Sequence, residues 1–299
     1  MRRCVVCVAL LALGMLWSAP AAAGLFGDDA DQKPQVSDSA IAEIERALDD
    51  QRYLDAGRML DQVALASEDD PRIGVLTGEL ALARSRPQDA LARFKMLDTV
   101  AAVRPRALQG EGIALAALGK TDEAIPVLQK AVAEDAGLWR AWNALGVECD
   151  QRHDWAGAEA AFEHALKASG DSPIVLNNRG FSRLSQNRPD EAIADFVQAL
   201  QKKPDFASAR NNLRLAIAMK GDYQRAVSGA SAADRAAVLN NAGYVAMLRG
   251  DYAAAKELFG QSMKAKGEYY GVAADNLEMA KTLEAGKPGP ARKADAGSH

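Results

Sequence analysis

Residues 139–172 read WRAWNALGVECDQRHDWAGAEAAFEHALKASGDS, and residues 173–206 read PIVLNNRGFSRLSQNRPDEAIADFVQALQKKPDF. Both blocks are 34 residues long and align without a gap, which pairs Gly146 with Gly180 and Phe162 with Phe196. A fixed period of this length indicates a chain built from stacked structural repeats. The same spacing places unit starts at residues 37, 71, 105, 139, 173, 207 and 236, with the unit from 207 shortened to 29 residues.

Three columns of this alignment suit two packed helices. The eighth position reads Ile44, Gly78, Gly112, Gly146, Gly180, Arg214 and Gly243. The twentieth reads Ala56, Ala90, Ala124, Ala158, Ala192, Ala226 and Ala255. The twenty-fourth reads Leu60, Phe94, Leu128, Phe162, Phe196, Ala230 and Phe259. Small residues at the eighth and twentieth positions let two helices touch, and the large residue fills the space beside them.

Turn and breaker residues fall between the two halves of each unit. Gly119-Lys120-Thr121, Asn187-Arg188-Pro189-Asp190, Gly221-Asp222-Tyr223 and Gly250-Asp251-Tyr252 mark hairpin turns. Alanine recurs throughout, aromatic residues are 6% of the chain, and alternating Val- and Ile-rich runs are missing from the sequence. The composition therefore favours an all-α protein over one with sheets. In the shortened unit we expect a truncated second helix between Tyr223 and Ser231.

These columns resemble the tetratricopeptide-repeat (TPR) family, whose units are helical hairpins. The resemblance covers residues 37–286. It implies a solenoid, a right-handed superhelix of about seven hairpins, closed by a C-terminal capping helix within residues 270–286. Such arrays need caps because one unit cannot bury its own apolar face. We expect residues 24–36 to be a flexible leader and residues 287–299, which lack periodicity, to be disordered.

The first 23 residues have the three-part layout of a secretory signal peptide. Met1-Arg2-Arg3 is basic, residues 4–17 are almost unbroken apolar sequence, and the segment ends in Ala21-Ala22-Ala23. The alternative is a membrane anchor, but the apolar run is shorter than the roughly 20 residues of a spanning helix. We therefore expect cleavage after Ala23 and export to the periplasm. The mature protein is expected to have no transmembrane segment, with peripheral association with the outer membrane as one option.

Charge and cysteine content exclude several classes of function. The formal net charge of −4 gives nothing that attracts a nucleic acid backbone. Cys4 and Cys7 lie in the expected signal peptide, so Cys149 is the cysteine left to the mature chain. One cysteine cannot form an internal disulfide, and at the eleventh position of its unit Cys149 is expected to be a buried small apolar residue.

No pattern in the sequence indicates an enzyme, a cofactor or a metal site. Residues 114–121 read ALAALGKT, one residue away from a phosphate-binding loop, but Ala114 stands where that loop needs glycine. His153 falls in a predicted turn and His164 late in a predicted second helix, so they do not form a ligand pair. We find no set of nucleophile, base and orienting group.

Asparagine concentrates in the first helices of the last units. The fifth position reads Asn143, Asn177, Asn211 and Asn240, and the sixth reads Asn178, Asn212 and Asn241. Asparagine is a mediocre helix former, so its recurrence needs a reason. In TPR arrays the first helices line the concave face. An amide carries both a donor and an acceptor, and a row of amides there can bind a peptide backbone.

Phe181, Leu215 and Tyr244, at the ninth position, would add apolar contacts to this partner-binding groove. The alternative is that asparagine, above all at the sixth position, only bonds the neighbouring unit. We expect the fifth position to face the groove more openly than the sixth. TPR proteins that clamp carboxylates add lysines and arginines to such asparagines, and Arg140 is the one clear match here.

Two stretches resemble a narrower group. Residues 211–223, NNLRLAIAMKGDY, with the short helix after them, and residues 239–246, LNNAGYVA, resemble the TadD family of Flp/Tad pilus assembly. The resemblance implies a scaffold or adaptor that supports assembly of a pilus or secretion channel, with partners among the pilus or secretin components. The alternative is a general cell-envelope TPR adaptor, or an assembly chaperone for another envelope machine.

Overall fold

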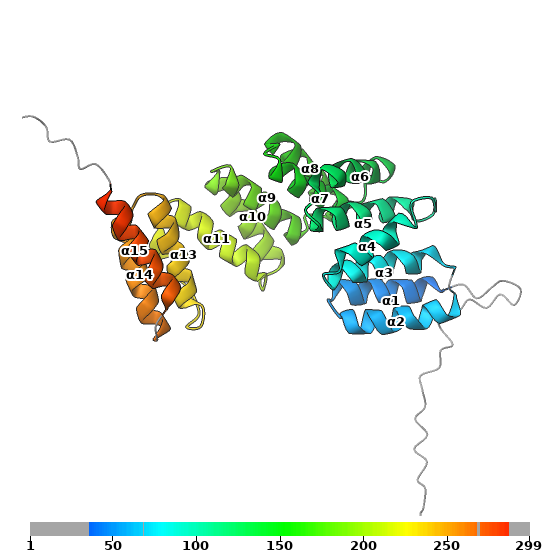
Figure 1. Cartoon of the computed structure of the whole chain (residues 1–299), viewed down its shortest axis with the longest axis horizontal. Coiled ribbons are helices and arrows are strands. Elements are labelled where there is room, and N and C mark those ends of the chain that lie inside the picture. Colours follow the sequence, from blue (N-terminus) through cyan, green and yellow to red (C-terminus); the bar gives the residue numbers. More distant parts are fainter. Residues whose placement is uncertain (1–35, 68, 268–269, 287–299) are drawn as a thin grey trace, which may run out of the picture. The chain divides into compact units, whose positions relative to one another are not determined.

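A computed structural model describes residues 36–67, 69–267 and 270–286. The expected signal peptide, nearly all of the expected leader and the expected disordered tail lie outside the described residues. The described part of the chain folds into 15 helices, arranged as successive hairpins (Figure 1). The predicted all-α solenoid of seven hairpins and a last helix is confirmed.

The chain divides into two compact units, up to Val103 and from Arg104 onward. The first unit has two hairpins, α1 (Asp38–Asp49) with α2 (Tyr53–Ala66) and α3 (Pro71–Ala83) with α4 (Pro87–Lys95). The second unit continues with α5 (Arg104–Ala117), α6 (Thr121–Glu134), α7 (Trp139–Gln151), α8 (Trp155–Ser169), α9 (Pro173–Ser185), α10 (Pro189–Lys202), α11 (Ala207–Met219), α12 (Tyr223–Val227), α13 (Arg235–Leu248), α14 (Tyr252–Lys266) and α15 (Gly271–Ala285).

Most hairpins close around a glycine that faces a large side chain. A Cβ on Gly180 would lie 2.7 Å from the ring of Phe196, and one on Gly146 would lie 2.7 Å from the ring of Phe162. Carbon atoms in contact normally lie about 3.5–4.0 Å apart. The eighth position of these units therefore has room for glycine alone. The twentieth-position alanines are also at the contact, since each is at most 1% exposed.

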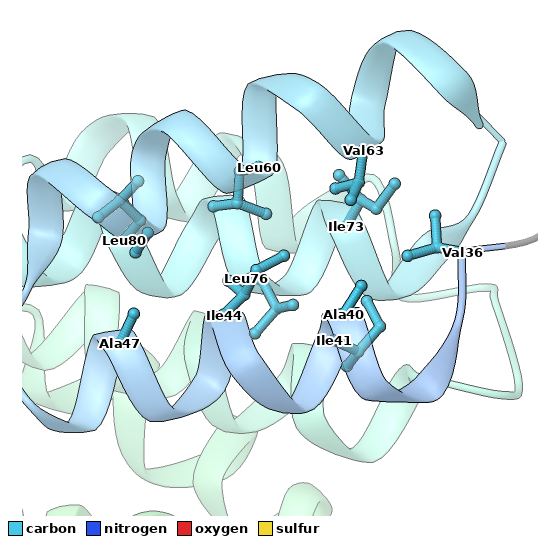
Figure 2. Packing of buried hydrophobic residues seen from close by; sticks show 11 residues of the cluster. Val36, Ala40, Ile41, Ile44, Ala47, Leu60, Val63, Ile73, Leu76 and Leu80 are labelled. Carbon is cyan, nitrogen blue, oxygen red and sulfur yellow. The ribbon is translucent and has the colours of Figure 1, made fainter. Parts of the chain in front are cut away.

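In the first unit, α1, α2 and α3 share one apolar core (Figure 2). It includes Ile44 and Leu60, which take the eighth and twenty-fourth positions of the first hairpin, together with Leu76 from α3. Arg72 at the start of α3 donates hydrogen bonds to the carbonyl of Val36 (2.8 Å) and to Asp38 (2.6 Å). These bonds tie the beginning of α1 to the next hairpin.

The turns within hairpins follow local chemistry. The first helices of three units are followed by Gly119, Gly221 and Gly250, with φ of 71°, 87° and 76°. Glycine adopts this left-handed backbone region without steric strain. In two of these turns the next residue is an aspartate, and Asp222 and Asp251 accept hydrogen bonds from backbone amides in the first turns of α12 and α14. This cap satisfies one of the amides that have no partner inside the helix.

The shortened unit departs from the pattern as expected. Its second helix, α12, has five residues. Arg214 stands at the glycine position, Ala230 at the large position, and the Arg214 guanidinium donates to the carbonyl of Gly229 at 3.2 Å. The Arg214 side chain thus contacts the segment that follows α12.

Candidate functional site

The asparagines of the second compact unit form a relay of hydrogen bonds between hairpins. The amide nitrogen of Asn178 donates to the side-chain oxygen of Asn143 (3.0 Å), and that of Asn212 donates to Asn177 (2.9 Å). Within α9, Asn177 donates to Asn178 (3.3 Å), which links the two steps. In each step a sixth-position amide donates to a fifth-position carbonyl of the preceding hairpin.

The last helix extends this relay. Asn276 of α15 donates to the side-chain oxygen of Asn240 at 3.0 Å. Counted from Gly271, Asn276 is at the sixth position, the same as the other donors. Sequence reasoning missed this residue, although extending the repeat register into the cap would have found it.

The expectation that the fifth position is the more open one is wrong in α9 and α13, and it holds in α11, where Asn211 is exposed and Asn212 is half-buried. Asn177 and Asn240 are 9% and 7% exposed, whereas Asn178 and Asn212 are half-buried and Asn241 is exposed. The reason is the direction of the relay, since the side-chain carbonyls of Asn177 and Asn240 are covered by the elements that donate to them, α11 and α15. Most of these amides therefore hold neighbouring hairpins together, as the packing interpretation requires.

The relay is broken at the shortened unit. By the same pattern, Asn241 of α13 would donate to Asn211 of α11, but within the described residues neither side chain makes a hydrogen bond, and both are exposed. The second helix that lies between α11 and α13 is the five-residue α12. Two adjacent hairpins thus present free amides at the junction where the repeat is incomplete.

A cavity of about 360 Å³ opens at this break. Its polar rim is formed by the amides of Asn211, Asn212, Asn240, Asn241 and Asn276, with Arg214. Its apolar wall comes from Leu215, Ala218, Ala226, Val238, Ala242, Tyr244 and Val245. The structure therefore brings six predicted groove residues into one cavity, those from α11 and α13. Ligand sites in proteins are typically of this kind, a mainly apolar pocket with a few polar groups that orient the ligand.

The other predicted groove residues lie elsewhere. Asn143, Asn177 and Asn178 belong to the relay and do not line the cavity. Phe181 is 51% exposed on α9, and Arg140 lies over the ring of Trp139 at 4.6 Å from its centre. The cavity wall also includes Val238 and Ala226, which sequence reasoning did not select because apolar residues at helical spacing look the same in a core and in a pocket.

An ion-pair network holds the hairpins beside the relay. Arg179 bonds both oxygens of Asp195 (2.7 and 3.1 Å), and Arg183 bonds Asp195 (2.9 Å) and Glu159. Burial tends to raise the pKa of Glu159, but the hydrogen bond from Arg183 and the neighbouring arginine charges hold it below its ordinary value. The network fastens α8, α9 and α10 to one another, which gives α9 and its asparagines a fixed position.

The remaining candidate chemistry has structural roles. Cys149 is buried in α7, and burial together with the charges of Asp154 and Asp150 raises the pKa of its thiol. Ala114 is buried in α5, and Gly119 forms the turn before α6 rather than a loop after a strand. His164 stacks on Trp142 with ring centres 4.4 Å apart. In the part of the chain that the structure describes, no group of acidic, histidine or cysteine side chains could hold a metal ion, and no helix is long and apolar enough to span a membrane.

A model of the tetratricopeptide repeat matches residues 110–173 and 177–237. This part of the chain is therefore similar to the TPR family. The match covers α7, α9 and α11, which carry the relay from Asn143 to Asn212, and reaches the first residues of α13. The hairpins before and after it repeat the same columns, with Phe94 and Phe259 fully buried at the large position.

Solved structures share this TPR fold. The chain matches the crystal structure of the APC/C hetero-tetramer Cut9–Hcn1 with a TM-score of 0.63 and 18% identity, over 81% of this chain and 49% of that one. A thermophilic TPR protein of Thermus thermophilus matches with a TM-score of 0.54 and 20% identity, over 60% of this chain and 97% of that one.

Relatives with similar sequences match over short stretches. Protein FlbA of Caulobacter vibrioides is 31% identical over 170 residues, 54% of this chain and 28% of FlbA. The peroxisomal targeting signal receptor of Candida glabrata is 38% identical over 65 residues, 22% of this chain and 11% of the receptor. Human tetratricopeptide repeat protein 13 is 27% identical over 124 residues, 42% of this chain and 14% of that protein. This chain spans less than a third of the length of each.

Proposed function

We propose that this protein is a scaffold that holds an extended segment of a protein partner in the cavity between α11 and α13. The observation that carries the proposal is the break in the amide relay, where Asn211 and Asn241 are exposed and make no hydrogen bonds within the described residues. TPR arrays act in protein–protein interactions, so a peptide is the ligand that this surface suits.

The geometry of the cavity supports an extended peptide. The side-chain carbonyl of Asn211 can accept from a backbone N–H, and the amide nitrogen of Asn241 can donate to a backbone carbonyl. A bound strand would thus take the place of the missing relay step. An apolar side chain of the partner would enter between Leu215, Val238 and Tyr244, which line the cavity together with the amides.

One relative points in the same direction. By its name, the Candida glabrata protein is a receptor for a peroxisomal targeting signal. A protein with a similar stretch of sequence is thus named for the recognition of a targeting signal. For the present chain we propose recognition of a protein segment, at a site set by the break in its own relay.

Capture from the cell envelope tests the binding site. The double variant Asn211→Ala and Asn241→Ala removes two exposed amides that support no other hairpin. The matched control, Gln62→Ala with Gln201→Ala, removes two exposed helical amides outside the cavity. Partner recovery is expected to fall severalfold with the first pair and to stay at the parent level with the second. Equal recovery from both pairs contradicts the proposal.

We further propose that the protein is exported and works in the periplasm, in assembly of a Flp/Tad-type pilus or secretion channel. The layout of the first 23 residues and the TadD-like stretches around Asn211 and Asn240 support this proposal. N-terminal sequencing from the native host is expected to give a chain that starts near Gly24. Recovery of intact Met1 in the membrane fraction contradicts export.

A deletion strain separates the pilus role from the alternative. Loss of surface pili that the intact gene restores supports assembly of a Flp/Tad-type machine, as does a gene position beside pilus ATPase, secretin and prepilin genes. Normal piliation in the deletion strain favours the general envelope adaptor or chaperone. The capture experiment is independent of this result, since either role uses the same cavity.

A further inference from the structure

A second cavity of about 440 Å³ lies in the first compact unit, between α2, α3 and α4. It is separate from the cavity of the broken relay. Four arginines and one aspartate line it. The lining residues are Leu54, Gly57, Arg58, Leu60, Asp61, Ala64, Thr77, Leu80, Arg84, Arg86 and Arg93, and we call this cavity the arginine groove.

Gly57 fixes the position of one of these arginines. The guanidinium of Arg84, directly after α3, donates to the backbone carbonyl of Tyr53 at 2.7 Å. A Cβ at position 57 would lie 2.6 Å from that guanidinium, so the glycine is what lets Arg84 lie across α2. Arg84 thus has a fixed place in the groove, while its partner is a neutral carbonyl that leaves its charge uncompensated.

The remaining charges do not neutralise the groove. Arg58 pairs with Asp55 and Arg86 with Asp89 at 3.6 Å, both on the exposed surface. Such exposed pairs contribute little and exchange readily. Arg93 has no hydrogen bond or ion pair with any described residue. Asp61 is the one acidic side chain that lines the groove, so positive charge dominates there.

Three leucines line the groove, and one of them is exposed. Leu60 and Leu80 belong to the core of the first unit (Figure 2) and are 4% and 5% exposed, so they offer a ligand little surface. At the rim, Leu54 is 78% exposed. A free inorganic anion would gain nothing from Leu54. An acidic peptide with an apolar side chain between its carboxylates would use both Leu54 and the guanidinium groups.

We propose that the arginine groove binds an acidic peptide segment of a partner protein, through carboxylates held by Arg58, Arg84 and Arg93. A guanidinium presents its N–H groups in a planar fork that matches a carboxylate with two parallel hydrogen bonds. The exposed Leu54 contacts an apolar side chain between the carboxylates. This site works independently of the broken relay, because the two cavities lie in different compact units.

Fluorescence anisotropy with a labelled peptide tests the proposal. The probe is fluorescein-labelled DLEDLE, with NLQNLQ as the uncharged probe of the same length. The double variant Arg58→Gln and Arg93→Gln is expected to raise the Kd for DLEDLE about tenfold, which corresponds to about 1.4 kcal/mol of binding free energy. Binding is also expected to weaken as the salt concentration rises, since the groove charges are exposed. The variants change exposed helical side chains, and circular dichroism checks that they fold.

The control removes the same charge elsewhere. Arg46→Gln with Arg235→Gln takes two exposed arginines from outside the groove and is expected to leave binding within about twofold of the parent. Equal weakening by both pairs would show general attraction of charge and overturn the proposal. It is also overturned if NLQNLQ binds as well as DLEDLE, or if DLEDLE does not bind. Binding of inorganic phosphate is measured separately by calorimetry. If phosphate binds and DLEDLE does not, the groove is a small-anion site instead.

Discussion

Adding one methyl group at Gly180 tests the contact that defines most of the hairpins. The new Cβ of Gly180→Ala would lie 2.7 Å from one ring carbon of Phe196 and 3.0 Å from two others. The ring would have to move by roughly 1 Å to restore a normal contact, and it is fully buried. Overpacking of this kind costs about 1–3 kcal/mol. Replacing a helical glycine by alanine by itself stabilises a helix by about 1 kcal/mol. The variant is therefore expected to be less stable than the parent by up to about 2 kcal/mol.

The sign of this effect should depend on Phe196. In a Phe196→Ala background, itself about 3–5 kcal/mol less stable, the added methyl meets empty space, and Gly180→Ala is expected to stabilise by about 1 kcal/mol. Gly260→Ala is the matched control, because a Cβ on this glycine of α14 meets no atom within 4 Å, and it should stabilise in either background. Urea unfolding followed by far-UV circular dichroism measures the whole set of variants. Stabilisation by Gly180→Ala beside an intact Phe196 would refute the reasoning.

Three further changes test the packing around the site. Ala192→Phe is expected to cost about 1–3 kcal/mol in a thermal melt, because Ala192 is fully buried where two helices touch; an unchanged melt would contradict the repeat register. Glu159→Gln is expected to lower stability by about 1 kcal/mol at pH 7. The pKa of Glu159 is below its ordinary 4.5 in the fold, so its contribution is present above that value and disappears as the pH falls through the lowered pKa; a difference that persists at low pH would contradict this. Cys149 is expected to be alkylated far more slowly in the folded protein than in urea, as mass spectrometry of its peptide can measure, because it is buried and its thiol pKa is raised; equal rates would contradict its burial.

The hairpins could be predicted from sequence because they depend on residue size at a fixed period. The glycine and aromatic columns indicated the contact between Gly180 and Phe196, and the reduced spacing after Ala207 indicated the short α12. These features are local, since both partners lie in one unit of 34 residues. The same regularity explains why the last helix could be recognised as a cap.

The candidate sites could be predicted in part. Asparagine at two positions indicated amides along one face, but the repeat pattern does not say which of them bond each other across hairpins. The hydrogen-bond partners depend on the direction in which each side chain points between units. Asn177 and Asn240 are buried, whereas Asn211 and Asn241 are exposed. The arginine groove was not predicted because its charges come from α2, α4 and the turn before α4, at unrelated positions in the repeat.

Photo-crosslinking from the wall of the broken-relay cavity shows whether a partner lies in it. Tyr244 lines the cavity on α13, whereas Leu248, one turn later on the same helix, is 69% exposed and lies outside it. Each is replaced by p-benzoylphenylalanine in the native host, and the irradiated adducts are compared. We expect a partner adduct from position 244 that is lost when Asn211→Ala and Asn241→Ala are added, and little adduct from position 248. Equal adducts from both positions, or an adduct at 244 that survives loss of the two amides, would contradict it.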